Sequence, residues 1–129
     1  MLVRDVMKGE VLSISPLITL ADARQVFAQR DVKYLVVMQG SDVQGVLSLS
    51  DLEGIGEDIQ QHIKVSERMT YTPACVADSS NLEDAVRLIQ DAGLKALPVC
   101  RGNTLVGIVT LSDIEEFFSR HPITPPKTS

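Results

Sequence analysis

The sequence has no tryptophan and few other aromatic residues, with 2 tyrosines and 3 phenylalanines among its 129 residues. A platform on which nucleobases stack needs more exposed rings than these. Basic residues are also scarce, because 12 lysines and arginines against 17 acidic residues give a formal net charge of −5. Without a basic stripe we expect no binding of polymeric nucleic acid, although a single nucleotide needs far fewer cations.

Long apolar runs are absent, and the first eight residues already contain an acid and two bases. This pattern fits neither a transmembrane helix nor a secretory leader. Cysteine is scarce too, since Cys75 and Cys100 are the 2 in the chain and neither has metal-type spacing to His62 or His121. One pair is too little for a disulfide scaffold, so we expect two free thiols, a cytoplasmic location and no membrane contact.

The sequence offers no constellation for catalysis. Nucleophilic catalysis needs a nucleophile, a base and an orienting group, and neither cysteine has a histidine partner. His62 lies in the polar stretch 57–62, and we interpret Glu57 and Asp58 there as a solvated face rather than as metal ligands. We predict a protein that is not an enzyme, with no catalytic residue, no metal site and no catalytic cofactor.

An internal repeat organises the chain. At an offset of 62 residues, Met7 aligns with Met69, and the register continues without a gap to Asp51 on Asp113. Chance does not hold one register over this length, so the chain consists of two copies of a unit of about 60 residues. The composition, 44% hydrophobic and 22% charged, is typical of a soluble globular chain.

Each copy is predicted to contain a short extended segment, a helix, two strands and a second helix. Thr19 and Asn81 are the expected N-caps of the first helices, and Gly93 is the expected stop of the second copy's helix. The expected hairpins pair 34–38 with 43–49, and 96–100 with 105–111.

The second helix of each copy is expected to open with a capping box, at 50–53 (SDLE) and 112–115 (SDIE). Proline-rich residues 122–126 cannot continue a helix, so 120–129 is predicted to be a flexible tail.

One copy alone cannot bury the apolar face of its sheet. We therefore predict a mixed α/β (α+β) fold in which two β-α-β-β-α repeats, 1–62 and 63–119, are related by a pseudo-twofold axis and pack through their sheets. This packing would leave clefts between the repeats. The residues expected in the core, or beside it, are Val37, Val99, Val46 and Ile108.

The strongest chemical signal is the heptapeptide 45–51 (GVLSLSD), which returns as 107–113 (GIVTLSD). It places a hydroxyl at the end of a strand and a carboxylate in the first turn of the next helix. Amides at a helix N-terminus attract phosphate, and a carboxylate can accept hydrogen bonds from the two hydroxyls of a ribose. The combination suits an adenosine nucleotide.

A purely structural interpretation of the same residues stays open. Ser50 and Ser112 can cap helices, and Asp51 and Asp113 favour the helix dipole without any ligand. Lysines precede a strand in both copies, at Lys33 and Lys95, where each is either a solvated surface charge or a phosphate counter-ion.

The doubled heptapeptide, the run 94–99 (LKALPV) and a Val-Met start followed by Val-x-x-x-Pro resemble a tandem pair of CBS domains, a Bateman module. The resemblance covers residues 3–118. It implies a sensor that binds AMP, ADP, ATP or S-adenosylmethionine, with or without Mg²⁺, in a cleft between the repeats. It also implies a homodimer.

The resemblance further implies a role for each residue that matches the family pattern. The segments 12–14 and 74–76 would offer backbone groups to the adenine edge. The implied ligand contacts are Asp51 and Asp113 to the ribose hydroxyls, Ser48, Ser50, Thr110 and Ser112 to sugar or phosphate, Val46, Ile108 and Pro98 to adenine or ribose, and Lys33 and Lys95 to phosphate.

The first copy departs from the pattern more than the second. Val36 replaces the proline that Pro98 supplies, and Gly54 and Gly56 weaken the following helix by about 1 kcal/mol each relative to alanine. In both copies, Val32 and Leu94 stand where some members carry a histidine for phosphate. We expect the better site around Thr110 and Asp113.

The expected function is that of a stand-alone regulatory protein, an energy or metabolite sensor that binds an adenosine-containing ligand and signals to a partner protein. The alternative is a structural dimerisation module whose clefts bind no ligand. The sequence does not choose among AMP, ADP, ATP, S-adenosylmethionine, NAD and a cyclic dinucleotide, and it does not identify the regulated partner.

Overall fold

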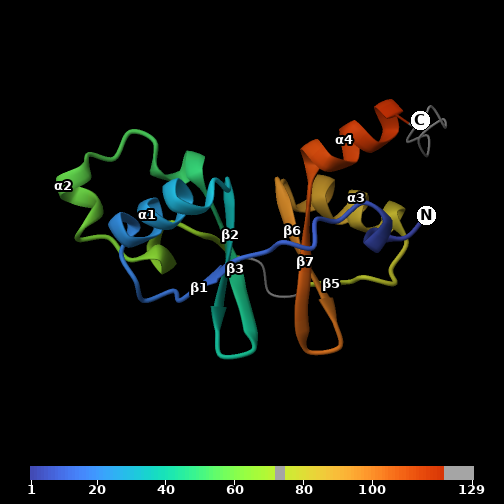
Figure 1. The fold of residues 1–129 in the computed structure, drawn as a ribbon, viewed down its shortest axis with the longest axis horizontal. Helices are drawn as coiled ribbons and strands as arrows, with labels where there is room; N and C mark the ends of the chain where they lie inside the picture. Colours follow the sequence, from blue (N-terminus) through green and yellow to red (C-terminus); the bar gives the residue numbers. More distant parts are fainter. Residues whose placement is uncertain (72–74, 121–129) are drawn as a thin grey trace. The chain divides into compact units, whose positions relative to one another are not determined.

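The structure is a computed structural model that describes residues 1–71 and 75–120 (Figure 1). The chain divides into two compact units, Met1–Glu10 with Cys75–Ser129, and Val11–Ala74. We call the first the terminal unit, because it contains both ends of the chain, and the second the central unit. The predicted tail lies outside the described residues, apart from Arg120, which ends the last helix.

The central unit contains a four-stranded sheet of order β1-β2-β3-β4. Strand β1 (Ser13–Ile14) is parallel to β2 (Tyr34–Gln39), and helix α1 (Leu20–Arg30) connects them. Strand β2 forms a hairpin with β3 (Asp42–Ser48), and β4 (Thr70–Tyr71) lies antiparallel on the outer side of β3. Between β3 and β4 lie the 3-10 turns η2 (Leu49–Leu52) and η3 (Val65–Glu67) and the short helix α2 (Glu57–Gln60).

The terminal unit repeats this plan with a three-stranded sheet of order β5-β6-β7. Strand β5 (Val76–Ala77) is parallel to β6 (Ala96–Arg101), and helix α3 (Leu82–Ala92) connects them. Strand β6 forms a hairpin with β7 (Thr104–Thr110), and helix α4 (Leu111–Arg120) follows directly. The chain start contributes the 3-10 turn η1 (Val3–Asp5) and an antiparallel bridge from Lys8 to Ile108 on the outer side of β7.

The first segment of the chain therefore folds with the second repeat. Lys8 bridges to Ile108 in the terminal unit, and Thr70 pairs with Val46 in the central unit, at equivalent positions of the repeat. The compact units and the sequence repeats are two different divisions of this chain. Each sheet is completed by the segment that precedes the other repeat.

Alternate residues of each hairpin point to the helices of the same unit, as the period of a strand requires. In the central unit Leu35, Val37 and Leu47 pack in one cluster with Leu20 and Phe27 of α1. The equivalent cluster of the terminal unit contains Leu97, Val99, Val109, Leu82 and Ile89. The predicted burial of Val37, Val99, Val46 and Ile108 is confirmed, with exposures of 0%, 0%, 6% and 6%.

The first helices of the two repeats begin where the sequence predicts. Thr19 is the N-cap of α1. Its amide donates to Oδ2 of Asp22, and the Asp22 amide donates to Oγ1 of Thr19, both at 3.2 Å. Asn81 is the N-cap residue of α3, although its side chain makes no capping hydrogen bond. Gly93 ends α3 in the left-handed conformation with a φ of 64°.

The second helices differ between the repeats. Helix α4 has 10 residues, whereas the equivalent η2 is a turn of 4 residues. Gly54 lies just after η2 with a φ of 79°, a conformation that is incompatible with a continuing right-handed helix. Gly54 is thus incompatible with extension of η2 into a helix as long as α4.

The two cysteines form a disulfide between Cys75 and Cys100, with their Cα atoms 5.8 Å apart, so the prediction of two free thiols is wrong. The fold places Cys75 just before β5 and Cys100 on the neighbouring β6, within disulfide range despite a separation of 25 residues. The cysteines therefore give no support for the expected cytoplasmic location. An ion pair strengthens the same junction, since Arg101 donates from Nε and Nη2 to Oδ2 of the buried Asp78 at 3.0 and 2.8 Å.

Loss of the disulfide should destabilise the protein. The cross-link restricts the unfolded chain, so Cys75→Ser should lower the free energy of unfolding by about 2–4 kcal/mol. Urea denaturation of the wild type with and without dithiothreitol measures the same loss, and the reductant should not change the variant further. Two thiols that alkylate in the folded, unreduced protein would show that the bond is absent.

Candidate functional site

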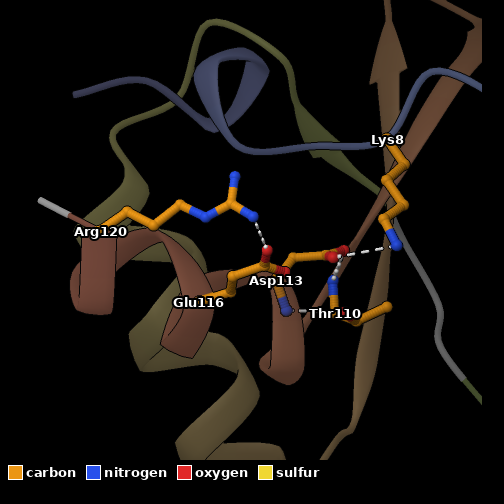
Figure 2. A network of polar contacts seen from close by, with 5 residues as sticks. All are labelled: Lys8, Thr110, Asp113, Glu116 and Arg120. Carbon is orange, nitrogen blue, oxygen red and sulfur yellow. Dashed lines mark hydrogen bonds and ion pairs between the residues drawn. The ribbon is translucent and has the colours of Figure 1, made fainter.

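Thr110 and Asp113, two of the residues selected from the sequence, lie together where β7 passes into α4 (Figure 2). The Thr110 amide donates to Oδ2 of Asp113 at 3.3 Å, and the Asp113 amide donates to Oγ1 of Thr110 at 3.0 Å. Both residues are buried, with exposures of 8% and 9%. The reciprocal bonds hold the hydroxyl and the carboxylate in fixed positions.

These bonds form a capping box two residues earlier than predicted, so the boxes expected at 50–53 and 112–115 are wrong. The Leu111 amide donates to the Lys95 carbonyl at 2.9 Å, and the Leu49 amide donates to the Lys33 carbonyl at 2.9 Å. The helical turns start at these two leucines, which makes Thr110 and Ser48 the N-cap residues. Ser50 and Ser112 therefore lie within the first turns, where both are exposed.

Lys8 is a member of the site that the sequence analysis did not select. Its Nζ atom lies 3.3 Å from Oδ1 of Asp113, and Figure 2 shows the lysine reaching the carboxylate from the chain start. The Lys8 side chain is 70% exposed, whereas the carboxylate side chain is 8% exposed. The two oxygens of Asp113 thus have separate partners, with the Thr110 amide on Oδ2 and the lysine on Oδ1.

The backbone around Lys8 is fixed from two sides. The Lys8 amide donates to the Ile108 carbonyl at 2.9 Å, and the Ile108 amide donates to the Lys8 carbonyl at 3.0 Å. Upstream, the Val3 amide donates to the Ser80 carbonyl at 2.9 Å, and Val3 is completely buried. The alignment of Met7 with Met69 makes the two leading segments equivalent, but only the strand pairing shows that the first of them joins the sheet of the second repeat.

Gly107 permits this close approach. A Cβ atom at this position would lie 2.7 Å from the Lys8 carbonyl oxygen and 2.8 Å from Sδ of Met7. A Cβ at Gly45 would collide with the carbonyl oxygen of Thr70 in the same way. The glycine that opens each heptapeptide is therefore required by strand pairing rather than by a turn.

The remaining candidates of the second repeat surround the capping box. Pro98 is opposite Ile108 in the hairpin, and Ala96 is opposite Thr110. Pro98 and Ile108 are buried, whereas Lys95, next to the strand end, has an exposed side chain. The terminal unit therefore brings together Lys95, Pro98, Ile108, Thr110, Ser112 and Asp113, to which the structure adds Lys8.

The central unit brings together the equivalent set, Lys33, Val46, Ser48, Ser50 and Asp51. The Ser48 amide donates to Oδ2 of Asp51 at 2.8 Å, and the hydroxyls of Ser48 and Ser50 lie 2.7 Å apart. Ser48 and Asp51 are only partly buried, and Thr70 occupies the position equivalent to Lys8. The two sites therefore share their backbone plan and differ in burial and in the cation at the aspartate, since Lys8 pairs with the Asp113 carboxylate whereas Arg68 donates to the Asp51 carbonyl at 3.3 Å.

The acidic pair Glu57 and Asp58 is exposed. Glu57 forms an ion pair with Arg24 of α1, and this hydrogen-bonded guanidinium lowers the pKa of the Glu57 carboxyl.

Within residues 1–71 and 75–120, no group of three or more histidine, cysteine or acidic side chains is arranged to hold a metal ion. None of the helices in the described part of the chain has the length and apolar character needed to cross a membrane.

Comparisons with known proteins agree with this arrangement. The family model of the CBS domain matches residues 3–54 and 64–120. The CBS domain-containing protein YhcV of Bacillus subtilis (strain 168) is 30% identical over 114 residues, which cover 87% of this chain and 81% of that protein.

Solved structures show the same fold. The hexameric CBS-CP12 protein from bloom-forming cyanobacteria superimposes with a TM-score of 0.82 and 23% identity over 99% of this chain and 73% of that chain. The CBS domain pair of protein MJ0100, solved in complex with 5′-methylthioadenosine and S-adenosyl-L-methionine, gives a TM-score of 0.78 at 18% identity, covering 94% of this chain and 98% of that chain. The predicted mixed α/β class is confirmed, with two sheets and four helices among the described residues.

Substitution of Gly107 should weaken the terminal unit through steric overlap alone. Gly107→Ala should lower the free energy of unfolding by about 1–3 kcal/mol, because the methyl group displaces the Lys8 backbone from β7. Gly9→Ala is the matched control, since a Cβ there meets no atom within 4 Å, and it should change stability by less than about 0.5 kcal/mol. Equal unfolding midpoints for the two variants in urea would contradict this role of the glycine.

Proposed function

The chain belongs to the CBS domain family, and from this premise we propose that it is a regulatory module that binds an adenosine-containing ligand and signals to a partner protein. The observation that carries the proposal is the buried Asp113 carboxylate, held by Thr110 and faced by a lysine at the end of β7. We propose a binding role and no catalytic one.

Asp113 has the properties needed to bind a ribose. An ionised carboxylate is an acceptor with about four lone-pair positions, so it can accept from both ribose hydroxyls, at Oδ2 beside the Thr110 amide and at Oδ1 in place of Lys8. The capping box holds the group in place before a ligand arrives, which reduces the entropy lost on binding. Burial raises the strength of each bond by excluding competing water.

The neighbouring residues supply the other parts of a nucleoside site. Ile108 and Pro98 are buried apolar residues that lie opposite each other on paired strands, and we assign them to adenine or ribose, as the family resemblance implies. Thr110 and Ser112 offer hydroxyls to sugar or phosphate, and the exposed Lys95 offers a positive charge. The equivalent set in the central unit is Val46, Ser48, Ser50, Asp51 and Lys33, in which Ser48 and Asp51 are more exposed than Thr110 and Asp113.

We favour the terminal unit as the stronger site. Its carboxylate is more deeply buried than Asp51, and its helix α4 is complete, whereas the central unit has only the turn η2. The ligand class is supported by the CBS pair of MJ0100, whose two ligands share an adenosine group. AMP, ADP, ATP and S-adenosylmethionine all carry that group, with Mg²⁺ as a companion of the polyphosphates.

The second candidate function is a ligand-free dimerisation module. It is favoured by the capping box itself, because Thr110 and Asp113 satisfy each other without any ligand. A panel of adenosine ligands in a thermal melt separates the two functions, since a ligand at 100 times its dissociation constant adds about 2.7 kcal/mol of stability. A flat panel would favour the structural module.

Removal of the terminal unit's carboxylate should weaken binding. Asp113→Ala should reduce the affinity for AMP or a related adenosine ligand by about 1.5–3 kcal/mol, because two charge-assisted hydrogen bonds to the ribose are lost. Isothermal calorimetry measures the change, and Asp51→Ala is the matched control with the smaller expected loss. An unchanged affinity in Asp113→Ala, with the variant shown to be folded by circular dichroism, would contradict the assignment.

We also propose that the protein is a homodimer, which the family resemblance supports. Light scattering at micromolar concentration should give twice the 14.1 kDa mass of the chain. A monomer mass under these conditions would contradict the proposal, and a larger mass would indicate a higher assembly such as the hexamer of the CBS-CP12 protein.

A further inference from the structure

We propose that Lys8 makes the terminal unit selective for phosphorylated adenosine ligands. The lysine pairs with Oδ1 of Asp113. When a ribose hydroxyl donates to this oxygen, the ammonium group of Lys8 leaves it. The ammonium group then pairs with a phosphate of the same ligand. The inference rests on the proposed function and specifies the ligand class of that site.

The geometry makes Lys8 a movable counter-ion beside a fixed anion. Its backbone is held by two hydrogen bonds to Ile108, whereas its side chain is 70% exposed and ends 3.3 Å from the carboxylate. A lysine side chain has a flexible four-carbon stem, so the ammonium group can turn while the backbone stays in place. Asp113 cannot follow, because the capping box holds it.

Lys8 is the lysine that pairs directly with the Asp113 carboxylate. The next cation in Figure 2, Arg120, pairs with Glu116 of the same helix at 2.6 Å. When a ribose hydroxyl replaces the ammonium group at Oδ1, Lys8 loses its ionic partner, while the exposed Lys95 remains a second cation of the same site. A ligand phosphate close to the ribose gives the ammonium group a second anion at this point.

The internal repeat provides a comparison within the same chain. Thr70 and Lys8 occupy equivalent backbone positions, each paired with the second residue of its heptapeptide, Val46 or Ile108. The central unit thus has the same strand pairing with a neutral side chain at this position. The positive charge of Lys8 is therefore not required to build the fold.

Competition for Oδ1 predicts opposite effects on two ligands that differ only in the phosphate. Adenosine must displace the lysine from Oδ1 and has no phosphate with which the lysine could then pair. Lys8→Thr removes this cost, so it should strengthen adenosine binding by about two- to fivefold, the range of an exposed ion pair. AMP loses its counter-ion in the same variant, so its affinity should fall about tenfold. A residue that only supports the fold would move both affinities in one direction.

The experiment measures adenosine and AMP binding by calorimetry in the Asp51→Ala background, so that the central unit contributes little. Lys8→Thr is compared with Lys8→Arg, which keeps the positive charge and should retain the preference for AMP. Lys64→Thr is the control for net charge, since this exposed lysine lies in the central unit, outside both candidate sites, and should leave the ratio of the two affinities unchanged.

The outcomes separate this inference from the function on which it rests. If adenosine and AMP both bind and Lys8→Thr changes both affinities by the same factor, or leaves AMP unchanged, the selective role of Lys8 is refuted while the nucleoside site stands. If the protein with Lys8 binds neither adenosine nor AMP, the inference fails, and the proposed function fails with it only if the thermal-melt panel of the other adenosine ligands is also flat. Opposite shifts, with Lys8→Arg resembling the parent, would establish the role.

Discussion

The antiparallel bridge between a leading segment and the outer strand of a hairpin is the interaction on which the rest of this structure depends. Lys8 makes it with Ile108 and Thr70 makes it with Val46, and in both cases a glycine beside the bridge lets the two backbones approach. Because each leading segment precedes the other repeat, the bridge completes each sheet with a distant part of the chain. It also brings the ammonium group of Lys8 to the buried carboxylate.

The capping box at the start of α4 combines a structural and a chemical role. Thr110 and Asp113 satisfy two amides that a helix start leaves without partners, and the same bonds hold a carboxylate still under low solvent exposure. A fixed acceptor next to an apolar strand surface is what a nucleoside sugar requires. The structural interpretation of these residues and the binding interpretation are therefore compatible.

The two repeats have diverged around one backbone plan. The central unit replaces a 10-residue helix with the 4-residue turn η2 and places a threonine where the terminal unit has Lys8. The terminal unit is stabilised further by the Cys75–Cys100 disulfide and by two hydrogen bonds from Arg101 to one carboxylate oxygen of Asp78. The more constrained unit is thus also the one with the more buried carboxylate.

The sequence by itself determined the repeat, the mixed α/β class, the N-cap at Thr19, the stop at Gly93 and the hairpins, because these depend on local periodicity and backbone preference. It did not determine the disulfide, because the two cysteines come together only when their strands pair. It also did not determine where the second helical turns start, because this depends on the hydrogen bonds from the Leu49 and Leu111 amides to the lysine carbonyls. Only the tertiary structure placed Lys8 beside Asp113, because a contact across more than one hundred residues depends on which segment completes the sheet.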